Sequence, residues 1–144
     1  MSYPQCRFCQ QTLEHVFVDL GMSPLCQTHI SAEQLNAMEA FYPLRVYVCA
    51  NCLLVQLEEF VAPADIFTEY AYFSSYSDSW VEHALKYCDL MCDRFGLASG
   101  STVMEIASND GYLLQHFVAR NITVLGIEPA ENVAQAAIAR GVRA

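Results

Sequence analysis

Short runs of alternating apolar and polar residues characterise the first 60 residues of the chain. Because alternation at every second position is typical of strands, we predict three strands at residues 16–20, 44–48 and 53–57. The last two flank a tight turn and would form a hairpin. A serine at the start of residues 31–38 predicts a short capped helix, and Pro43 breaks the pattern after it.

A helical pattern follows an aromatic and serine-rich stretch, residues 67–80. The helix presents a stripe of apolar positions, spaced four and three residues apart, formed by Val81, Leu85, Cys88, Cys92 and Phe95. Ser79 and Glu82 match a capping box at its start, and Gly96 supplies a stop. We expect the two cysteines to act as small apolar residues and His83 to be solvated.

From residue 101 the pattern changes to alternating strands and helices. The predicted elements are a short buried strand at 101–107, a turn at 108–111, a helix at 112–120, a strand at 122–127 and a helix at 131–140, closed by Gly141. This β-α-β-α order begins a parallel doubly wound sheet. Two strands and two helices cannot cover both faces of such a sheet.

Charge and composition limit the partners that the chain can have. The net charge is −9, with only seven Lys and Arg, which argues against a nucleic-acid surface. No apolar stretch approaches the ~20 residues that span a bilayer, and the first residues lack an apolar run of signal-peptide length. We therefore expect a cytoplasmic protein with no membrane partner. The sequence does not indicate an oligomeric state.

Four of the seven cysteines form two identical C-x-x-C pairs, Cys6 with Cys9 and Cys49 with Cys52. Two such pairs supply the four thiolates of a structural zinc site, which has no open position for catalysis. Two disulfides or four free thiols are the alternatives, and the lack of a secretory signal disfavours disulfides. Iron is a lesser competitor for the same ligands. A module of ~60 residues buries little apolar surface, so metal binding would supply much of its folding free energy.

Cys26 and His29 stand in a further C-x-x-H spacing. They could replace one C-x-x-C pair or hold a second metal, but two of the four ligands would then be missing. We therefore expect Cys26 to be a small packed residue.

The aromatic stretch before the long helix has two interpretations. Its rings could simply pack under the helix, which is the usual role of aromatic residues near an element. Its many hydroxyl and phenol groups beside apolar rings would equally suit the wall of a cleft that holds a polar ligand with planar parts. The residues alone leave both interpretations open.

The turn at residues 108–111, the SNDG turn, indicates a ligand site. It places small residues and backbone N–H groups at the carboxyl end of the first strand, where open α/β sheets bind ligands. Glu128 closes the second strand, where a carboxylate can accept hydrogen bonds from both hydroxyls of a ribose. A solvated strand end is the alternative for Glu128, and the combination with the turn favours ribose binding.

Two common nucleotide-binding motifs are absent. The turn has neither the Gly-x-Gly-x-x-Gly pattern of dinucleotide binding nor the Gly-Lys-Ser or Gly-Lys-Thr of a phosphate-binding loop. Glu105 lies inside the first strand, where a carboxylate is a poor neighbour for phosphates and a suitable one for a cationic ligand. S-adenosylmethionine, with its sulfonium and ammonium groups, meets that requirement.

These motifs together resemble one enzyme family. The two C-x-x-C pairs, YAYFSSYSDSWVEHA, VMEIASNDGYLL and GIEPAENVA, in this order, are similar to the N-terminal part of S-adenosylmethionine-dependent methyltransferases. Members carry an N-terminal zinc-binding domain and include sugar C-methyltransferases that act on nucleotide-linked keto-deoxysugars. The resemblance covers nearly the whole chain.

The resemblance implies roles for named residues. Cys6, Cys9, Cys49 and Cys52 would hold structural zinc. S-adenosylmethionine would be bound by Glu105, Ala107, Ser108, Asn109, Asp110, Gly111, Glu128 and Pro129. Tyr76 would contact the substrate or the reacting part of the cofactor. Ala107 departs from the glycine that many such methyltransferases have, so its methyl group would narrow the turn slightly.

The expected fold class combines α+β and α/β parts: a zinc-ribbon-like module, a connecting helix and a truncated Rossmann-like sheet. The expected domains are a zinc-binding domain at 1–60, the aromatic segment with the connecting helix at 61–96, and a partial S-adenosylmethionine-binding domain at 97–144. Family members are several domains long. We therefore expect an N-terminal fragment of a methyltransferase, inactive by itself, with a nucleotide-linked sugar as the parent's substrate. The alternative is a non-enzymatic zinc-ribbon adaptor that docks a protein partner through exposed apolar surface.

Overall fold

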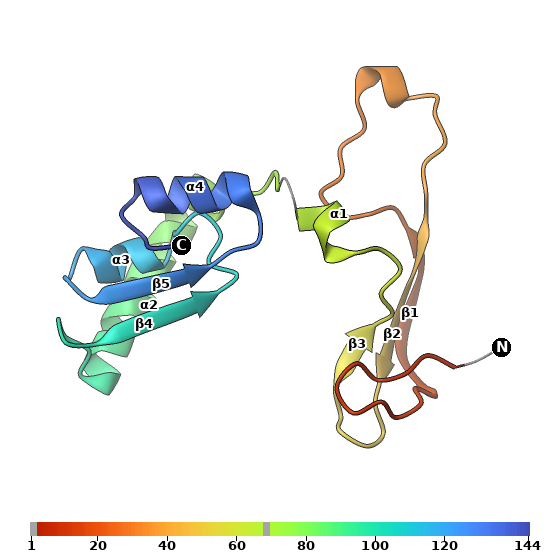
Figure 1. Ribbon diagram of the computed structural model, residues 1–144, viewed down its shortest axis with the longest axis horizontal. Helices are drawn as coiled ribbons and strands as arrows, with labels where there is room; N and C mark the ends of the chain where they lie inside the picture. Colours follow the sequence, from red (N-terminus) through yellow and green to blue (C-terminus); the bar gives the residue numbers. More distant parts are fainter. Residues whose placement is uncertain (1–2, 68–69) are drawn as a thin grey trace. The chain divides into compact units, whose positions relative to one another are not determined.

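The computed structural model describes residues 3–67 and 70–144, which form two compact units, Met1–Ile66 and Phe67–Ala144 (Figure 1). Residues 1–2 of the expected zinc-binding domain and residues 68–69 of the predicted aromatic stretch lie outside the described residues. No helix within the described ranges is long and apolar enough to cross a membrane.

The first unit contains an antiparallel sheet with the strand order β1-β2-β3. Its strands are β1 (His15–Ser23), β2 (Tyr42–Val48) and β3 (Val55–Leu57), which confirms the three predicted strands. The core is small and sits at the cysteine end of the sheet, where Cys6, Leu13, Tyr47 and Cys49 are buried together. A core of this size agrees with the expectation that the unit needs a further source of stability.

Pro43, which the sequence predicted to end the helical pattern, lies inside β2, opposite Met22 of β1. On the other side of β2, the pairing with β3 begins only at Val46. Pro43 therefore has no strand partner on that side. The N–H that proline lacks is not needed there for a hydrogen bond of the sheet.

The predicted helix over residues 31–38 is shorter in the structure. Only Ala32–Gln34 forms a single 3-10 turn, η1, which the Gln34 Oε1 closes by accepting the N–H of Ser31 at 2.9 Å. All residues from 26 to 41 are exposed, so no apolar face is packed against a core. A helix without such packing is marginal at this length, which explains why the pattern yields one turn. A second short helix, α1 (Pro63–Phe67), follows the sheet in sequence.

The second unit has the predicted β-α-β-α order after a long helix. Its elements are η2 (Ser74–Tyr76), α2 (Asp78–Phe95), β4 (Thr102–Ile106), α3 (Leu114–Val118), β5 (Thr123–Ile127) and α4 (Glu131–Ala139). The strands β4 and β5 pair in parallel, in register from Thr102 opposite Thr123 to Ile106 opposite Ile127. The core is formed by Cys88, Leu114, Phe117, Ile122, Val124, Ala137 and Val142.

The start of α2 differs from the prediction. Ser77, and not Ser79, is the N-cap residue, and its Oγ accepts the N–H of Trp80 at 3.4 Å. Ser79 lies in the first turn, with its hydroxyl 3.0 Å from that of Ser77. The end is as predicted, since Gly96 has φ +62° and donates its N–H to the carbonyl of Cys92.

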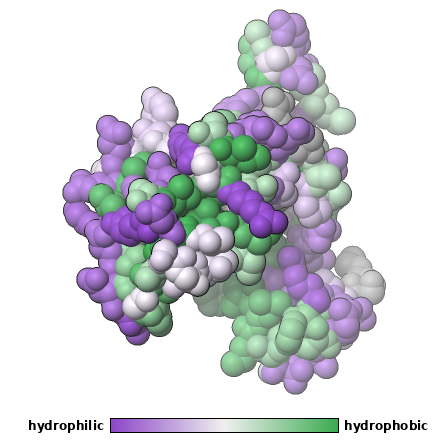
Figure 2. Space-filling view, turned by 60° about the vertical axis from the view of Figure 1, so that its left-hand side comes forward, coloured by the Kyte–Doolittle hydropathy of each residue, from purple (hydrophilic) through white to green (hydrophobic). Residues whose placement is uncertain are grey.

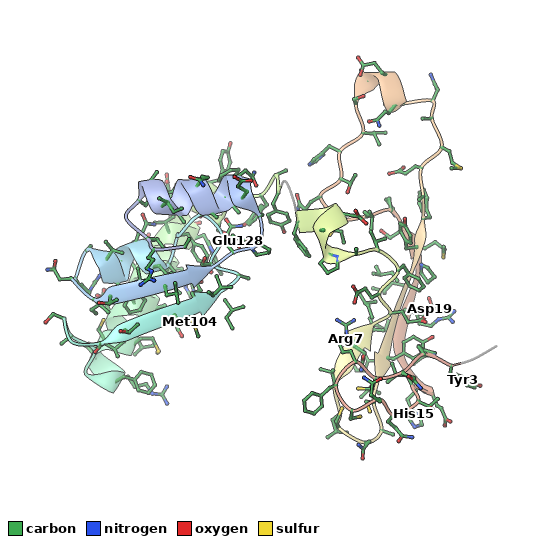
Figure 3. All side chains as sticks on the ribbon, in the orientation of Figure 1. Tyr3, Arg7, His15, Asp19, Met104 and Glu128 are labelled. Atoms are coloured by element: carbon green, nitrogen blue, oxygen red, sulfur yellow. The ribbon has the colours of Figure 1, made fainter. Side chains whose placement is uncertain are left out.

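The strand β4 is buried on one face only, whereas the sequence predicted a buried strand. Met104 and Ile106 are 60% and 75% exposed, and Ile127 beside them on β5 is 45% exposed. On the other face Val103 and Val124 pack with the core. Figure 3 labels Met104 on β4. Figure 2 shows hydrophobic residues exposed between hydrophilic ones. The expectation that the helices cannot cover both faces is confirmed.

The chain returns to the sheet after α4. Gly141 has φ +84°, and the carbonyl of Arg143 accepts the N–H of Gly126 at 2.7 Å. The residues after α4 therefore run beside β5, on the edge that β4 does not occupy. This is the geometry with which a second crossover of a parallel sheet begins.

Candidate functional site

The two C-x-x-C pairs adopt the same local conformation. In the first, the N–H of Gln10 bonds to the carbonyl of Cys6 at 2.9 Å, and in the second the N–H of Leu53 bonds to that of Cys49 at 3.0 Å. Gln10 and Leu53 both have φ +63°, a left-handed conformation that lets each turn close tightly. The identical spacing in the sequence thus corresponds to two equivalent knuckles.

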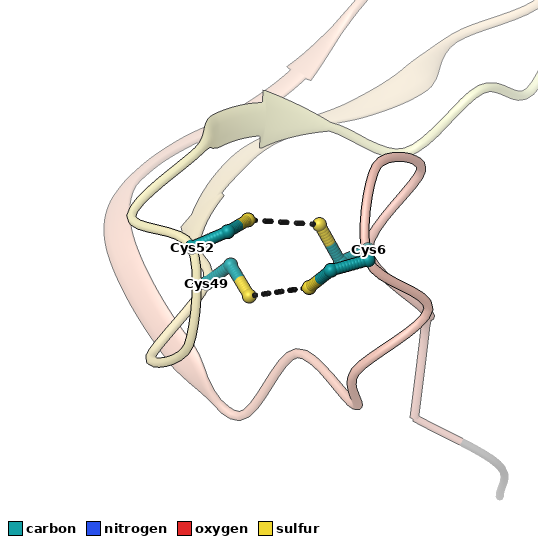
Figure 4. Close-up of side chains that lie close together, drawn as sticks. Cys6, Cys49 and Cys52 are labelled. Atoms are coloured by element: carbon teal, nitrogen blue, oxygen red, sulfur yellow. Dashed lines mark hydrogen bonds between the residues drawn. The ribbon is translucent and has the colours of Figure 1, made fainter.

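The four sulfurs converge on one point (Figure 4). All lie within 4.8 Å of one another, and the sulfurs of Cys6 and Cys52 are 3.6 Å apart, those of Cys9 and Cys49 3.5 Å. A tetrahedral zinc site with bonds of about 2.3 Å requires sulfurs about 3.8 Å apart. Disulfide bonds need sulfurs about 2.05 Å apart, and all four cysteines are free. The arrangement fits a metal.

The surrounding hydrogen bonds favour thiolates in part of the cluster. The N–H of Cys9 lowers the pKa of the Cys6 thiol to about 6 against the opposing effect of burial, and the Gln56 Nε2 donates to the same sulfur at 3.1 Å. At Cys52 the N–H of Leu54 also lowers the pKa, but burial and the three other thiols raise it to about 12. Four thiolates at this distance require a cation between them.

No other metal site competes with this cluster in the part of the chain that the structure describes, where it is the one group of three or more possible ligands brought together. Cys26 is exposed and lies outside the cluster, so it is not the packed residue that the sequence predicted. Cys88 is fully buried and Cys92 half-buried on α2, as expected for apolar packing.

The SNDG turn follows β4 and is tied to the end of β5. The N–H groups of Ala107 and Ser108 donate to the carbonyl of Ile127 at 2.8 and 3.3 Å. Positive φ angles occur at three alternate positions, with +60° at Ala107, +48° at Asn109 and +78° at Gly111. Left-handed conformations are usual for glycine, so the backbone has the shape of a glycine-rich loop although only one of the three residues is glycine.

The carboxylate of Glu128 lies directly against this turn. Its two oxygens accept the N–H of Asn109 at 2.9 Å and the N–H of Ala130 at 3.0 Å. Figure 3 shows Glu128 beyond the end of β5. The predicted turn and the predicted carboxylate therefore meet at the carboxyl ends of the two parallel strands. Each carboxylate oxygen can still accept a second hydrogen bond.

Glu105 lies half-buried in β4 beside Tyr112. Burial raises the pKa of its carboxyl to about 7, and the hydrogen bond from the Tyr112 hydroxyl opposes that shift. One oxygen of Glu105, the Oγ of Ser108 and the Oδ1 of Asp110 are buried without a hydrogen-bond partner among the described residues. Ser108 fills the space beside Gly126, where a Cβ would lie 2.5 Å from the Ser108 Oγ.

The side chains of Asn109 and Asp110 face residues 72–75, a contact that sequence reasoning missed. Asn109 is 8% exposed and Asp110 fully buried. The Oδ1 of Asn109 accepts the N–H of Ser74 at 2.8 Å, and the Oδ2 of Asp110 accepts the N–H of Ser75 at 3.3 Å. An Asn-Asp pair in a turn next to a strand was a signal for such bonds, but the sequence does not say which distant segment they reach.

Tyr76 and Pro129, the remaining predicted site residues, are exposed. Tyr76 is 94% exposed at the end of η2, next to the segment that Asn109 and Asp110 hold. Pro129 follows Glu128 directly. The rings of Trp80 and Tyr112 stack with centroids 6.0 Å apart, so part of the aromatic stretch packs against the site.

Comparison with known proteins supports a zinc site at the cysteine cluster, and one of the matches also covers the second unit. Residues 6–67 match a family model described as "Putative zinc binding domain" (Methyltransf_13), which includes all four cysteines. The chain is also 35% identical over 138 residues to a protein named C-methyltransferase NovU from Streptomyces niveus. That match covers 96% of this chain but 33% of the relative, so the chain spans about a third of the relative's length.

The expected resemblance is therefore confirmed at both ends of the chain. The family match includes the metal cluster, and the relative's similarity extends through the SNDG turn and Glu128. The chain is thus similar over nearly its whole length to one third of a protein named as a C-methyltransferase, and its residues 6–67 match the model of a zinc-binding domain.

Proposed function

We propose that this chain is the zinc-bearing and cofactor-binding part of an S-adenosylmethionine-dependent methyltransferase. The observation that carries the proposal is the contact between the Glu128 carboxylate and the N–H of Asn109 at 2.9 Å. It places an acid suited to ribose hydroxyls beside a tight turn at the ends of two parallel strands, where α/β sheets bind nucleotides. The similarity to a C-methyltransferase supports the same function.

In this proposal, different residues contact different parts of the cofactor. Glu128 accepts the two ribose hydroxyls through its remaining lone pairs, with Pro129 beside it. The backbone of residues 107–111 lets the cofactor approach closely, as positive φ angles allow. The carboxyl of Glu105, in β4 beside Tyr112, faces the cationic methionine part.

The sheet belongs to a Rossmann-like fold in this proposal. Support comes from the parallel β4-α3-β5-α4 unit and from the return of Arg143 to the edge of β5. The four cysteines hold a structural zinc, because four thiolates leave no position open for a substrate.

The proposed reaction of the whole protein is C-methylation of a nucleotide-linked keto-deoxysugar. A general base removes the proton on the carbon next to the keto group, and the resulting enolate attacks the methyl group of S-adenosylmethionine in line, which releases S-adenosylhomocysteine. Tyr76 is exposed and follows Ser75, which contacts Asp110 of the turn, and it is the residue of this chain proposed to contact the reacting groups. No residue described here is assigned as the base.

Binding of S-adenosylhomocysteine to the isolated chain tests the cofactor site. We expect weak binding, with NMR shifts at the amides of residues 105–111. Glu128→Ala should abolish these shifts because the ribose loses its acceptor, while Glu131→Ala, which removes a nearby exposed carboxylate, should keep them. Equal shifts in both variants would contradict the ribose role. Tight binding would contradict the expectation that the chain alone is an incomplete site.

A non-enzymatic adaptor is the second candidate, favoured by the apolar face of β4 and β5. Met104, Ile106 and Ile127 are exposed together there, as expected for a surface that docks a protein. An adaptor does not need a carboxylate held against a turn, so the Glu128 contact favours the methyltransferase. The adaptor would be preferred if no amide of residues 105–111 responded to S-adenosylhomocysteine at any concentration tested.

A further inference from the structure

Asn109 makes contacts in three directions from a single position. Its backbone N–H donates to Glu128, its Oδ1 accepts the N–H of Ser74 at 2.8 Å, and its Nδ2 donates to the carbonyl of Tyr72 at 3.1 Å. The side chain thus binds one donor and one acceptor of the same backbone segment. This is the pattern with which a strand neighbour would pair, supplied here by an amide side chain.

Asp110 continues the contact one residue further. Its Oδ2 accepts the Ser75 N–H at 3.3 Å and also accepts the hydroxyl of Ser75. Arg140, after α4, lies 3.2 Å from the same carboxylate and donates to the Ser75 Oγ at 2.7 Å and to the carbonyl of Asp110. A buried carboxylate paired with a cation and a hydroxyl is held firmly in one position.

Asn132 holds the beginning of the same segment. Its Nδ2 donates to the carbonyl of Tyr70 at 2.7 Å, and its Oδ1 accepts the N–H of Tyr70 at 3.0 Å. This asparagine lies in α4 and is separate from the SNDG turn. The residues just before α2 are therefore fixed at two places, only one of which involves the turn.

We propose that Asn109 and Asp110 are positioning residues. They fix the segment 72–75 and the Glu128 carboxylate relative to each other and do not contact the cofactor with their side chains. The inference rests on the proposed function. The N–H of Asn109 fixes the carboxylate on one side, and its side chain fixes residues 72–74, just before Tyr76, on the other. A shift of residue 109 would therefore move both Glu128 and residues 72–74.

The choice of asparagine at position 109 follows from two requirements. The backbone there has φ +48°, which glycine and asparagine tolerate better than other residues. Glycine would satisfy the backbone alone, and asparagine adds the two bonds to residues 72 and 74. Both polar atoms of the amide are already engaged and the residue is 8% exposed, so little of it remains to contact a ligand.

The variant Asn109→Gly removes the side-chain bonds and keeps the backbone conformation. Amide hydrogen exchange, followed by NMR without ligand, should show the Ser74 N–H exchanging about tenfold faster or more, as expected when a protected amide loses its acceptor. The matched control is Asn121→Gly, the same substitution at an exposed residue with φ +57°, which should leave Ser74 unchanged. Asn132→Ala should release Tyr70 and leave Ser74 protected.

A second variant covers the case in which Asn109→Gly does not fold. Asn109→Asp keeps an acceptor for the Ser74 N–H and loses the donor to the Tyr72 carbonyl, so Ser74 should retain most of its protection. Wild-type exchange at Ser74 in Asn109→Gly, or full loss of protection in Asn109→Asp, would overturn the proposal.

Titration with S-adenosylhomocysteine separates this inference from the proposed function. In the wild-type chain the ligand should shift the amides of Asn109 and Ser74 together, and in Asn109→Gly the shift at Ser74 should disappear while the shift at residue 109 remains. Identical shifts in both chains would overturn the positioning role. If no amide of the wild-type chain responds, the proposed function fails. The exchange experiment would still decide whether Asn109 holds the segment.

Discussion

The backbone at Ala107 shows most clearly how single residues shape the candidate site. Its φ of +60° lies in the left-handed region, where an alanine Cβ crowds the following carbonyl. The sequence identified this position as a departure from glycine and predicted a narrower turn. The structure shows that the alanine adopts the left-handed conformation usual for glycine, so the departure from glycine costs stability.

Replacing Ala107 by glycine should therefore stabilise the second unit. We expect an increase of about 1 kcal/mol in its free energy of unfolding, because relief of the left-handed conformation exceeds the added flexibility of the unfolded chain. Urea unfolding followed by the fluorescence of Trp80, the one tryptophan of the chain, measures this change. Ala136→Gly, inside α4, should have the opposite sign. Destabilisation by both variants would show that Ala107 is not strained.

The raised pKa of Glu105 predicts how the stability of the second unit depends on pH. The folded carboxyl has a pKa of about 7 and the unfolded one an ordinary value of 4.5, so between these pH values the unfolded chain loses the proton first. The contribution of Glu105 is therefore complete below about pH 4.5, declines as the pH rises to about 7 and is constant above it.

Glu105→Gln should remove this decline. The difference in unfolding free energy between wild type and variant, measured with Trp80 fluorescence at several pH values, should fall between about pH 5 and 7. Glu82→Gln is the control, because Lys86 lowers the pKa of that exposed carboxyl below its ordinary value of 4.5, so its contribution should not change between about pH 5 and 7. A difference that is independent of pH would mean that Glu105 is ionised in the fold throughout this range.

At the scale of elements, local patterns were sufficient for prediction where one residue type decides the geometry. The C-x-x-C spacing defined both knuckles, and alternation defined the strands, because each signal lies within a few residues. The choice between Ser77 and Ser79 as the cap of α2 was not decidable, since both are serines at suitable distances from the helix. The contact of Asn109 with residues 72–74 could not be predicted from local patterns, because it joins segments that are far apart in the sequence.

The knuckles should act as one ligand set, although they come from distant parts of the chain. Cys49→Ser should lower the metal content from about one zinc per chain to well below that value, because three thiolates bind zinc far less tightly. Cys26→Ser is the matched control, since Cys26 is exposed and outside the cluster, and it should keep the metal. A wild-type protein, folded and never chelated, with little zinc would contradict the metal site.

At the scale of the whole molecule, the chain consists of two units with separate cores, one beside the metal cluster and one between the sheet and its helices. The first is small, so we expect its folding to depend on the metal, whereas the second has a larger core of its own. Loss of zinc in Cys49→Ser should therefore leave the Trp80 fluorescence of the second unit as it is in the wild type. The activity of the whole protein stays a proposal, because the chain spans about a third of the relative.

The exposed loop between β1 and β2 has a practical consequence for work on this protein. Residues 26–41 bury no side chain, yet they lie between the two halves of the metal site. The entropic contribution to the free-energy cost of closing such a loop rises slowly with its length, by about 0.6 kcal/mol for each doubling. A fluorescent label or an affinity peptide could therefore be inserted there and report on metal uptake from within the module.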